Sequence, residues 1–285
     1  MKILVVGGFG FIGSRIMKIL KGKGFEAYST CRNLNNMEIS RDFDSLVIEG
    51  NVSRESIDFD VIINAAGFYS NSRSLADIQK NIESNASLTI DIAKFISPKT
   101  KRLVHLSSYF EYAPNLSGHV WSQYAASKIL GRITLEKICM SLSTQFVSCV
   151  LYDNYCEDLS RGKFVDHLIK SCWSNSEFTV YNLNNEIDLI DLEYLVEKII
   201  EVAVDPIRDS STTFQIRSNE VFTTGEIIEM AKKIKKVRII QEEINQNESP
   251  PKATGIWDSA PDWPSSRVSK HFQDYLIKML NTNVS

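Results

Sequence analysis

The feature that most constrains the fold of this chain is a glycine-rich stretch, Gly7–Gly13, with the sequence GGFGFIG. The short apolar run Lys2–Val6 leads into it, and a helical pattern of apolar residues follows over Ile12–Lys23. Glycines at these spacings allow a tight turn, a close approach of backbone to a phosphate, and close packing of a helix on a strand. Because strand, loop and helix follow one another in this order, the stretch predicts a dinucleotide-binding unit.

The first half of the chain alternates short β-branched runs with longer helical patterns. We predict strands at Lys2–Val6, Glu26–Cys31, Ser45–Glu49, Asp60–Ala66, Arg102–Ser108 and Gln145–Tyr152. We predict helices at Ile12–Lys23, Ser74–Ile96, Ser122–Met140, Phe164–Trp173, Leu192–Val204, Thr224–Lys236 and Ser266–Leu280. Nearly continuous apolar strands that alternate with helices are typical of a parallel sheet covered on both faces.

Right-handed crossovers between such strands give an α/β fold with a doubly wound parallel Rossmann sheet. After Tyr152 the strand patterns thin out, which predicts a smaller, mixed C-terminal lobe. We therefore expect residues 1–152 to form the nucleotide-binding domain, with about 183–205 returning to it. Residues 153–285 are expected to form mainly the substrate-binding lobe.

Composition and charge exclude several classes of function. The formal net charge of −3 argues against a surface that follows nucleic-acid phosphates. No apolar run approaches the roughly 20 residues of a membrane span. The five cysteines are scattered without a C-x-x-C pair, and the four histidines offer no metal-ligand spacing. We expect a cytoplasmic protein with reduced thiols, no metal, and neither nucleic acid nor membrane as a partner.

The end of the second predicted strand bears on which dinucleotide is bound. NAD sites place an Asp or Glu there to bind the ribose 2′-hydroxyl. The stretch Ser29–Asn33 contains no carboxylate and carries Arg32 instead. An arginine can pair with the 2′-phosphate of NADP through charge-assisted hydrogen bonds. The sequence therefore favours NADP(H) as the cofactor.

A candidate proton donor lies on the predicted helix Ser122–Met140, where Tyr124 precedes Lys128 by four residues. This spacing places both side chains on one helix face. The preceding strand ends in Ser107 and Ser108. Because the carboxyl ends of parallel strands face the cofactor crevice, we expect serine, tyrosine and lysine to converge there.

The same spacing occurs a second time, in Tyr194 and Lys198. The leucines, valine and isoleucines around Tyr194 repeat at helical spacing. This pattern predicts a core-facing tyrosine on an amphipathic helix rather than a second site.

Together these motifs resemble the extended short-chain dehydrogenase/reductase family, in the branch that acts on nucleotide-linked sugars. The stretches that carry the resemblance are GGFGFIG, DVIINAAG, HLSSYFEY, YAASK and the helix with Asn81 and Asn85. The resemblance runs over nearly the whole chain. The opening and the stretch Gly162–Phe164 are most similar to CDP-paratose and CDP-abequose synthases, which reduce 4-keto dideoxy sugars.

The resemblance implies roles for individual residues. Tyr124 would exchange a proton with the substrate oxygen, and Ser108, or failing that Ser107, would hydrogen-bond the same oxygen. Lys128 would bind the nicotinamide ribose and lower the pKa of Tyr124 from its ordinary value of about 10. The implied cofactor-binding residues, besides Arg32, are Gly7, Gly10, Phe11, Ile12, Gly13, Ala65, Ala66, Gly67, Asn85, Tyr124 and Lys128. The implied substrate-binding residues are Ser108, Tyr109, Lys163 and Arg217.

Departures from the family pattern narrow the reaction. Sugar-nucleotide dehydratases of the family carry an Asp-Glu pair just after the catalytic serine, where this chain has Tyr109 and Phe110. The arginine that the family uses for the nucleotide diphosphate aligns with Ile187, which leaves Lys163 or Arg217 as its replacement.

These features fit NADPH-dependent reduction of a 4-keto nucleotide-linked deoxysugar. A nucleotide-sugar 4-epimerase and a non-catalytic NADP-binding regulator on the same fold remain alternatives. Many relatives form dimers, and a homodimer built on the two long helices Ser74–Ile96 and Ser122–Met140 is expected here.

Overall fold

The computed structural model describes residues 1–33, 36–40, 58–112, 120–207, 211–218, 220–242, 263 and 271–282. The chain divides into two compact units. Unit 1 comprises Met1–Leu151, Val196–Ile216 and Ser259–Trp263, and unit 2 comprises Tyr152–Leu195, Arg217–Asp258 and Pro264–Ser285. The sequence predicted a return to the first domain over about 183–205; the longer returning segment in the structure is Val196–Ile216.

Unit 1 is built on a seven-stranded sheet with the strand order β10-β6-β5-β4-β1-β2-β3. The strands are β1 (Lys2–Val6), β2 (Glu26–Asn33), β3 (Asn36–Ser40), β4 (Val61–Asn64), β5 (Arg102–Ser108), β6 (Gln145–Leu151) and β10 (Ser211–Ile216). All neighbours pair in parallel except β2 and β3, which are antiparallel. The predicted α/β fold with a parallel sheet is confirmed. The predicted strand Ser45–Glu49 lies outside the described residues.

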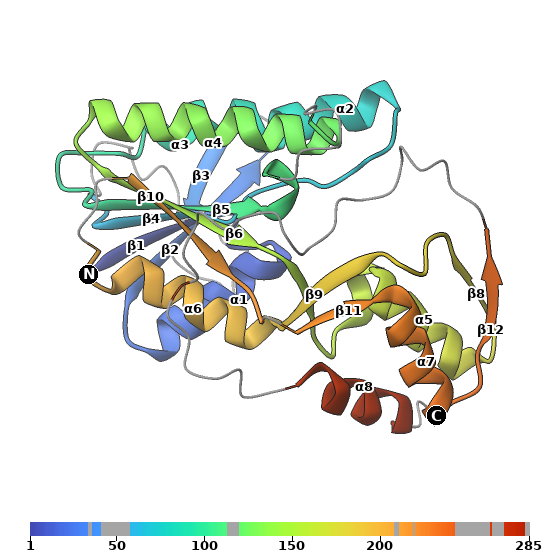
Figure 1. Ribbon diagram of the computed structural model, residues 1–285. Coiled ribbons are helices and arrows are strands. Elements are labelled where there is room, and N and C mark those ends of the chain that lie inside the picture. Colours follow the sequence, from blue (N-terminus) through green and yellow to red (C-terminus); the bar gives the residue numbers. More distant parts are fainter. Residues whose placement is uncertain are drawn as a thin grey trace. The chain divides into compact units, whose positions relative to one another are not determined.

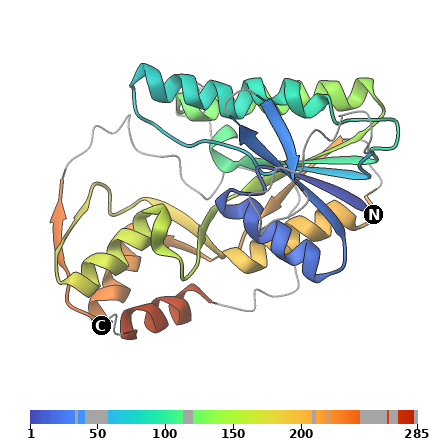
Figure 2. The ribbon, with the colours of Figure 1, turned by 180° about the vertical axis from the view of Figure 1, so that it is seen from behind.

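Helices cover both faces of this sheet, which is why β1, β4 and much of β6 are apolar. Helices α2 (Leu75–Ile82), α3 (Leu88–Ala93) and α4 (Gln123–Ser141) lie on one face (Figure 1). Helix α1 (Phe11–Gly22) and the unit 1 part of α6 (Leu192–Val204) lie on the other face (Figure 2). The core beneath α3 and α4 is made by Leu4, Val6, Tyr28, Phe59, Ile62, Leu88, Ile92, Phe95, Leu103, Leu135, Cys139 and Phe146.

The predicted continuous helix Ser74–Ile96 is wrong in its middle. Ser74 caps α2, accepting a hydrogen bond from the amide of Asp77 at 3.1 Å. A π-helical segment, η1 (Glu83–Ser87), then separates α2 from α3. At this segment α4 comes very close, because a Cβ at Gly131 would lie 1.9 Å from the carbonyl oxygen of Asn85. Single π turns are frequent at functional sites.

The described part of unit 2 contains two small sheets and three complete α-helices. One sheet has the order β11-β9-β7, from β7 (Asp153–Tyr155), β9 (Glu186–Asp191) and β11 (Val221–Thr223). The other pairs β8 (Glu177–Val180) with β12 (Arg238–Gln241). The helices are α5 (Phe164–Ser174), α7 (Thr224–Ile234) and α8 (Phe272–Asn281). The smaller, mixed C-terminal lobe is therefore confirmed.

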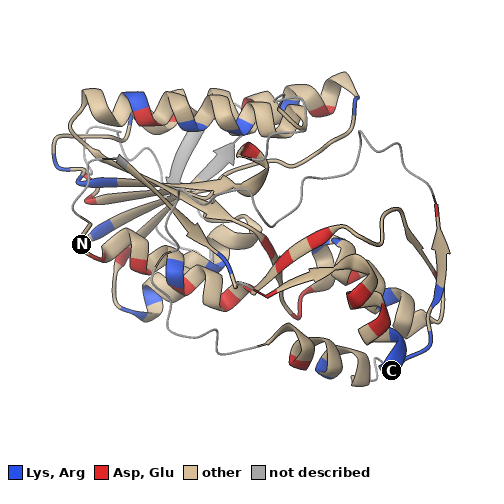
Figure 3. Ribbon diagram, in the orientation of Figure 1, with Lys and Arg blue, Asp and Glu red and all other residues tan. Residues whose placement is uncertain are grey.

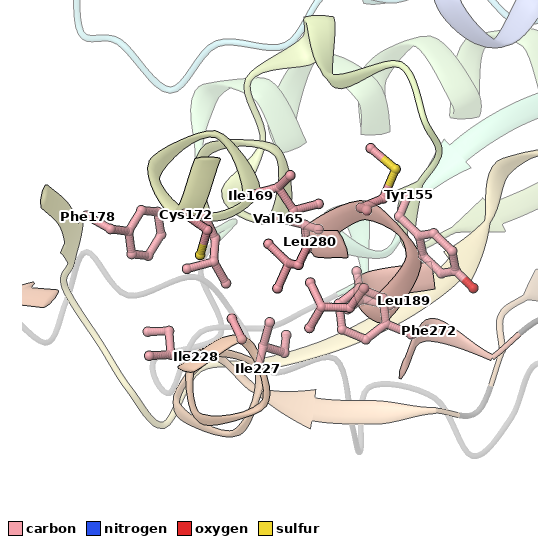
Figure 4. Close-up of a cluster of buried hydrophobic side chains, with 14 of the residues drawn as sticks. Tyr155, Val165, Ile169, Cys172, Phe178, Leu189, Ile227, Ile228, Phe272 and Leu280 are labelled. Carbon is pink, nitrogen blue, oxygen red and sulfur yellow. The ribbon is translucent and has the colours of Figure 1, made fainter. Parts of the chain in front are cut away.

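The core of unit 2 lies between these three helices and β9. Figure 4 shows side chains of α5, α7 and α8 converging on one apolar cluster. Phe272, Leu168 and Ile227 are each fully buried in it. Helix α8 thus packs against α5, and Trp173 of α5 donates to the carbonyl of Met279, 106 positions later in the chain.

Charged residues of both signs are interspersed along α4, α6 and α7 (Figure 3). Some form short surface pairs, such as Lys232 with Glu229 at 2.7 Å and Lys94 with Asp91 at 2.6 Å. Exposed ion pairs of this kind contribute about 0–1 kcal/mol each. Burial of apolar surface, rather than surface charge, therefore accounts for most of the stability of each unit.

Candidate functional site

The glycine stretch after β1 forms a turn that only glycine accommodates. Gly7 has φ of +80°, and the amide of Gly10 donates to the carbonyl of Gly7 at 2.9 Å. A Cβ at Gly13 would lie 2.1 Å from the carbonyl oxygen of Gly7, so α1 begins in contact with the turn. A Cβ at Gly7 would lie 2.8 Å from the Cα of Ala66. The turn therefore packs backbone to backbone against the loop that follows β4.

The start of α1 fits the pyrophosphate of a dinucleotide. Its N-cap is Gly10, and no described side chain caps the helix by a hydrogen bond. The first amides, at Phe11 and Ile12, therefore lie at the positive end of the helix dipole beside the glycine turn. Arg15 stacks its guanidinium on the Phe11 ring at 4.1 Å and donates to the Phe11 carbonyl at 2.8 Å. Glycines without side chains and an uncapped helix start are what an anionic phosphate needs.

Asn85 in the π turn connects the loop after β4 with the helix α4. Its side-chain Nδ2 donates to the carbonyl of Phe68 at 2.9 Å, and its Oδ1 accepts from the amide of Phe68 at 3.0 Å. The same Nδ2 donates to Ser127 Oγ at 2.9 Å. The sequence predicted Asn85, Ala66 and Gly67 as cofactor contacts. In the structure, Asn85 holds the Ala65–Phe68 loop next to α4 through these hydrogen bonds.

Tyr124 and Lys128 lie one turn apart at the start of α4, as predicted from their spacing. Ser122 caps the helix by accepting a hydrogen bond from the amide of Ala125 at 3.2 Å. Lys128 is only 4% exposed, and its Nζ donates to the carbonyl oxygen of Leu106 in β5 at 2.6 Å. Burial lowers the pKa of Lys128, whereas the charge of Glu111 raises it. The Lys128 ammonium is thus inserted under the carboxyl end of β5.

The two serines at that end have different surroundings. Ser107 is 3% exposed, and its hydroxyl donates to Glu111 Oε1 at 2.6 Å. Ser108 is half-buried, and its hydroxyl accepts a hydrogen bond from the amide of Phe110 at 3.4 Å. Of the two serines, Ser108 is the one whose hydroxyl is not turned into the interior.

A buried ion pair behind these residues was not singled out from the sequence. Glu111 Oε2 accepts from Arg132 Nε at 3.0 Å, with side-chain exposures of 0% for Glu111 and 17% for Arg132. The signal that could have found it is the spacing Ser-x-x-Glu from Ser108 to Glu111, which is typical of a capping box. The structure contains this box in the 3₁₀ helix η2 (Tyr109–Glu111).

An aromatic group surrounds Tyr124, and it too was not predicted. We use this name for Tyr69, Phe110 and Trp121. The ring centroid of Tyr124 lies 4.8 Å from that of Tyr69 and 6.3 Å from that of Phe110, in edge-to-face geometry. Trp121 stacks on Phe110 at 4.7 Å. Since Tyr69 is 52% exposed, the group presents an accessible aromatic surface beside Tyr124.

The remaining predicted substrate residues are distributed over both units. Tyr109 in unit 1 is 6% exposed. In unit 2, Lys163 precedes α5 and its Nζ lies 3.3 Å from an Asp153 carboxylate oxygen. Arg217 is half-buried. Ile187, which stands in place of the family arginine, is 7% exposed and packs in the core of unit 2.

Arg32 lies in β2 opposite Met37 of β3, and its side chain lies outside the described part of the structure. Within the described ranges, no group of three or more His, Cys, Asp or Glu side chains could hold a metal ion. No helix among the described residues has both the length and the apolar character needed to cross a membrane.

Residues 3–216 match the NAD dependent epimerase/dehydratase family, from the first strand to the end of β10. The chain belongs to this family. The resemblance inferred from the motifs is thereby confirmed. NAD or NADP is the cofactor expected for an epimerase/dehydratase family member. The glycine turn and the uncapped start of α1 agree with this expectation, because they leave room for a pyrophosphate.

Individual proteins similar to this chain share only a low fraction of identical residues with it. CDP-abequose synthase from Yersinia pseudotuberculosis is 25% identical over 250 residues, covering 82% of this chain and 85% of that protein. The structure of Pal from Bacillus thuringiensis has a TM-score of 0.76 at 17% identity, covering 98% of both chains. UDP-glucose 4-epimerase from Thermotoga maritima, solved with UDP-glucose, has a TM-score of 0.74 at 15% identity, covering 98% of this chain and 97% of the epimerase.

Proposed function

We propose that the protein is an NADPH-dependent reductase of a 4-keto nucleotide-linked deoxysugar, with Tyr124 as the proton donor. The observation that carries this proposal is the position of Tyr124 and Lys128, one turn apart at the start of α4. Lys128 reaches under the end of β5, and Asn85 ties α4 to the loop that contacts the glycine turn. A cofactor turn, a proton donor and a buried cation thus belong to one unit.

The residues proposed to hold the cofactor follow from the same contacts. Gly7, Gly10 and Gly13 leave room for the pyrophosphate, which the first amides of α1, at Phe11 and Ile12, would bind. Ala65, Ala66 and Gly67 line the neighbouring loop. When bound, NADPH supplies a hydride, and the protein contributes binding and orientation.

The protein residues then handle the proton. Tyr124 would donate it to the carbonyl oxygen that becomes the product hydroxyl, while Ser108 hydrogen-bonds the same oxygen. Lys128, held as a cation, would favour the tyrosinate that remains and so lower the pKa of Tyr124. Proton transfer by a positioned side chain contributes roughly 10²–10⁴-fold to rate.

A sugar nucleotide as substrate is supported by the distant relative named CDP-abequose synthase and by the aromatic group. Tyr69 is 52% exposed and presents an aromatic surface next to the proposed donor, and Phe110 stacks with Tyr69 and with Trp121. Aromatic ring faces suit the C–H surface of a sugar ring that has lost hydroxyl groups, because burying fewer hydroxyls avoids unpaired hydrogen-bond donors.

NADP(H) in preference to NAD(H) rests on Arg32 and on the absence of a carboxylate in Ser29–Asn33. The test is a fluorescence titration of the protein with NADPH and with NADH. We expect NADPH to bind at least tenfold more tightly, and the preference to disappear in Arg32→Ala. Equal or tighter binding of NADH by the wild-type protein contradicts this part of the proposal.

A 4-epimerase is the second candidate, because a structural neighbour is a UDP-glucose 4-epimerase. A dehydratase is disfavoured by Tyr109 and Phe110 in place of the Asp-Glu pair. A regulator on the same fold is disfavoured because the serine, tyrosine and lysine of the site are all kept. For the diphosphate of the substrate we propose Lys163 or Arg217, since Ile187 is buried in an apolar core.

A homodimer through α2, α3 and α4 is supported by large apolar side chains that these helices expose. These residues, between 43% and 84% exposed, are Leu75, Ile82, Ile90, Leu130, Ile133 and Met140. Monomeric soluble proteins rarely leave large contiguous apolar patches open to water. Light scattering should therefore give twice the monomer mass, reduced to one monomer by Leu130→Glu with Ile133→Glu, but not by the control Ile277→Glu on α8.

The reaction is tested by an NADPH-oxidation screen over CDP-, dTDP-, GDP- and UDP-linked 4-keto sugars, with the product configuration assigned by NMR. Stoichiometric oxidation of NADPH with one of these substrates supports the reductase. Interconversion of C4 epimers without added cofactor supports the epimerase instead. NADPH binding without any turnover across the panel supports the regulator.

A further inference from the structure

Glu111 places a carboxylate in the interior of unit 1, directly behind the proposed site. Its side chain is 0% exposed, although a buried ionised carboxylate is costly unless it is paired and hydrogen-bonded. It is not the acid that dehydratases use, because that position is held by Phe110.

The partners of Glu111 come from two elements of the site. Oε1 accepts from the hydroxyl of Ser107 at 2.6 Å and from the amide of Ser108 at 2.9 Å, at the end of β5. Oε2 accepts from Arg132 Nε at 3.0 Å, on α4 one turn after Lys128. One carboxylate thus joins the strand that carries the proposed serine to the helix that carries the proposed lysine.

Glu111 offsets one of the two positive charges that α4 carries near Lys128. Helix α4 contributes two cations, Lys128 and Arg132, and η2 contributes the single anion Glu111. From β5, His105 is neutral, because burial, then Lys128 and then Arg132 hold its pKa well below its ordinary value. Burial raises the pKa of Tyr112, which keeps this phenol neutral as well.

Two further described groups lie on α4 near these charges. Glu136 lies 4.0 Å from the outer nitrogen of Arg132 and is 28% exposed, so solvent screens it. Tyr124 lies one turn before Lys128 on the same helix. Removing Glu111 would therefore leave Lys128 and Arg132, one and two turns after the proposed proton donor on α4, without the buried carboxylate that pairs with Arg132.

We propose that Glu111 is a positioning residue, which neutralises one of the two cations on α4 and fixes the serine end of β5 against that helix. The proposal rests on the proposed roles of Tyr124 and Lys128. Glu111 acts through Lys128 and through Ser108 rather than by touching the substrate. The direction in which Glu111 shifts the pKa of Tyr124 and of Lys128 follows from its negative charge.

Neutral substitutions of Glu111 and of Arg132 should shift the pKa of Tyr124 and Lys128 in opposite directions. In Glu111→Gln a nearby negative charge is lost, which disfavours the Lys128 ammonium and favours the Tyr124 anion, so the pKa of both groups falls. In Arg132→Gln a positive charge is lost, so the pKa of both groups rises. Each shift should be about one pH unit, and the double variant should return close to the wild type.

The readout is a ¹³C NMR titration of protein labelled at the tyrosine Cζ, with the Tyr124 signal assigned by its loss in Tyr124→Phe. Circular dichroism and NADPH binding verify that each variant is folded. Opposite shifts in the two single variants support the proposal, because a merely structural defect does not change sign with charge. Folded variants in which Tyr124 titrates as in the wild type overturn it.

Glu111→Asp is the second variant, in case the glutamine variant does not fold. It keeps the charge but shortens the reach, so the Tyr124 titration should stay within about 0.3 pH units of the wild type while turnover falls. A shift as large as that expected for Glu111→Gln overturns the proposal. Since the titration needs no substrate, failure of every sugar nucleotide in the screen would count against the proposed reaction and leave this test intact.

Discussion

Helices α4 and α6 carry the same tyrosine–lysine spacing, and the structure gives the two pairs different surroundings. On α4, Lys128 is 4% exposed and donates to the backbone carbonyl of Leu106 in β5. On α6, Lys198 is 6% exposed, and its Nζ lies 2.9 Å and 2.8 Å from the two carboxylate oxygens of Glu201. The second lysine therefore has a carboxylate of its own one turn away.

The two tyrosines also differ in burial and in their neighbours. Tyr194 is 8% exposed, which confirms the predicted core-facing side chain. Tyr124 is half-buried and lies beside the aromatic group, in which Phe110 belongs to the segment that follows β5. Spacing alone fixes only that tyrosine and lysine share a helix face. The strand end against which that face packs decides whether the pair can do chemistry.

Phenylalanine substitutions at both tyrosines give the largest expected contrast. Tyr124→Phe removes the proposed proton donor, so kcat for reduction should fall by about 10³-fold or more with the fold unchanged. Tyr194→Phe should change kcat less than about threefold. Stopped-flow NADPH oxidation measures both. Near-normal turnover in Tyr124→Phe refutes the assignment of the donor.

Methionine substitutions at the two lysines sharpen the comparison of charge. Lys128→Met removes the cation that is proposed to favour the Tyr124 anion, so kcat should fall by about 10²-fold and NADPH should bind more weakly. Lys198→Met leaves the site untouched and should affect thermal stability alone. Calorimetric titration with NADPH, alongside kcat, separates binding from rate. Equal losses of kcat and of NADPH affinity in both variants would contradict a special role for Lys128.

Gly131 allows α4 to approach the π turn closely, and α6 contains no glycine that could do the same. In Gly131→Ala the new Cβ would lie 1.9 Å from the carbonyl oxygen of Asn85, so α4 or the π turn must move. We expect a loss of about 1–3 kcal/mol of stability in urea unfolding. The matched control is Gly22→Ala in α1, where a Cβ meets nothing within 4 Å. A Gly131→Ala variant as stable as the control shows that this close contact is dispensable.

The smallest effect is expected at the aromatic group. Trp121→Ala removes the ring that stacks on Phe110, and should raise KM for the sugar nucleotide about tenfold with little change in NADPH affinity. Trp173→Phe in unit 2, which removes a hydrogen bond to the carbonyl of Met279, should leave KM unchanged. An unchanged KM in Trp121→Ala speaks against sugar contact by this group.

Sequence patterns predicted unit 1 well where burial on both faces dictates the residues. β1, β5 and α6 have the predicted bounds. The π turn at Glu83–Ser87 was missed, since helical periodicity continues through it and the tertiary contact with Gly131 marks its place.

Short strands and buried polar residues were beyond single-sequence patterns. Strands β7 and β11 have three residues each, too few to show alternation. Glu111 and Arg132 are 21 positions apart, and neither letter signals burial, because both residue types are usually exposed. Their pairing depends on α4 lying across the end of β5, which only the folded chain establishes.

The most direct test of the proposed reaction follows the hydride itself. NADPH deuterated at C4 of the nicotinamide would be incubated with the protein and the 4-keto sugar nucleotide that turns over in the screen, and the product examined by NMR. We expect one deuterium at C4 of the sugar for each NADPH consumed in the wild-type protein and in Tyr194→Phe, and almost none in Tyr124→Phe. A product without deuterium, formed while NADPH stays unconsumed, would contradict net reduction at this site.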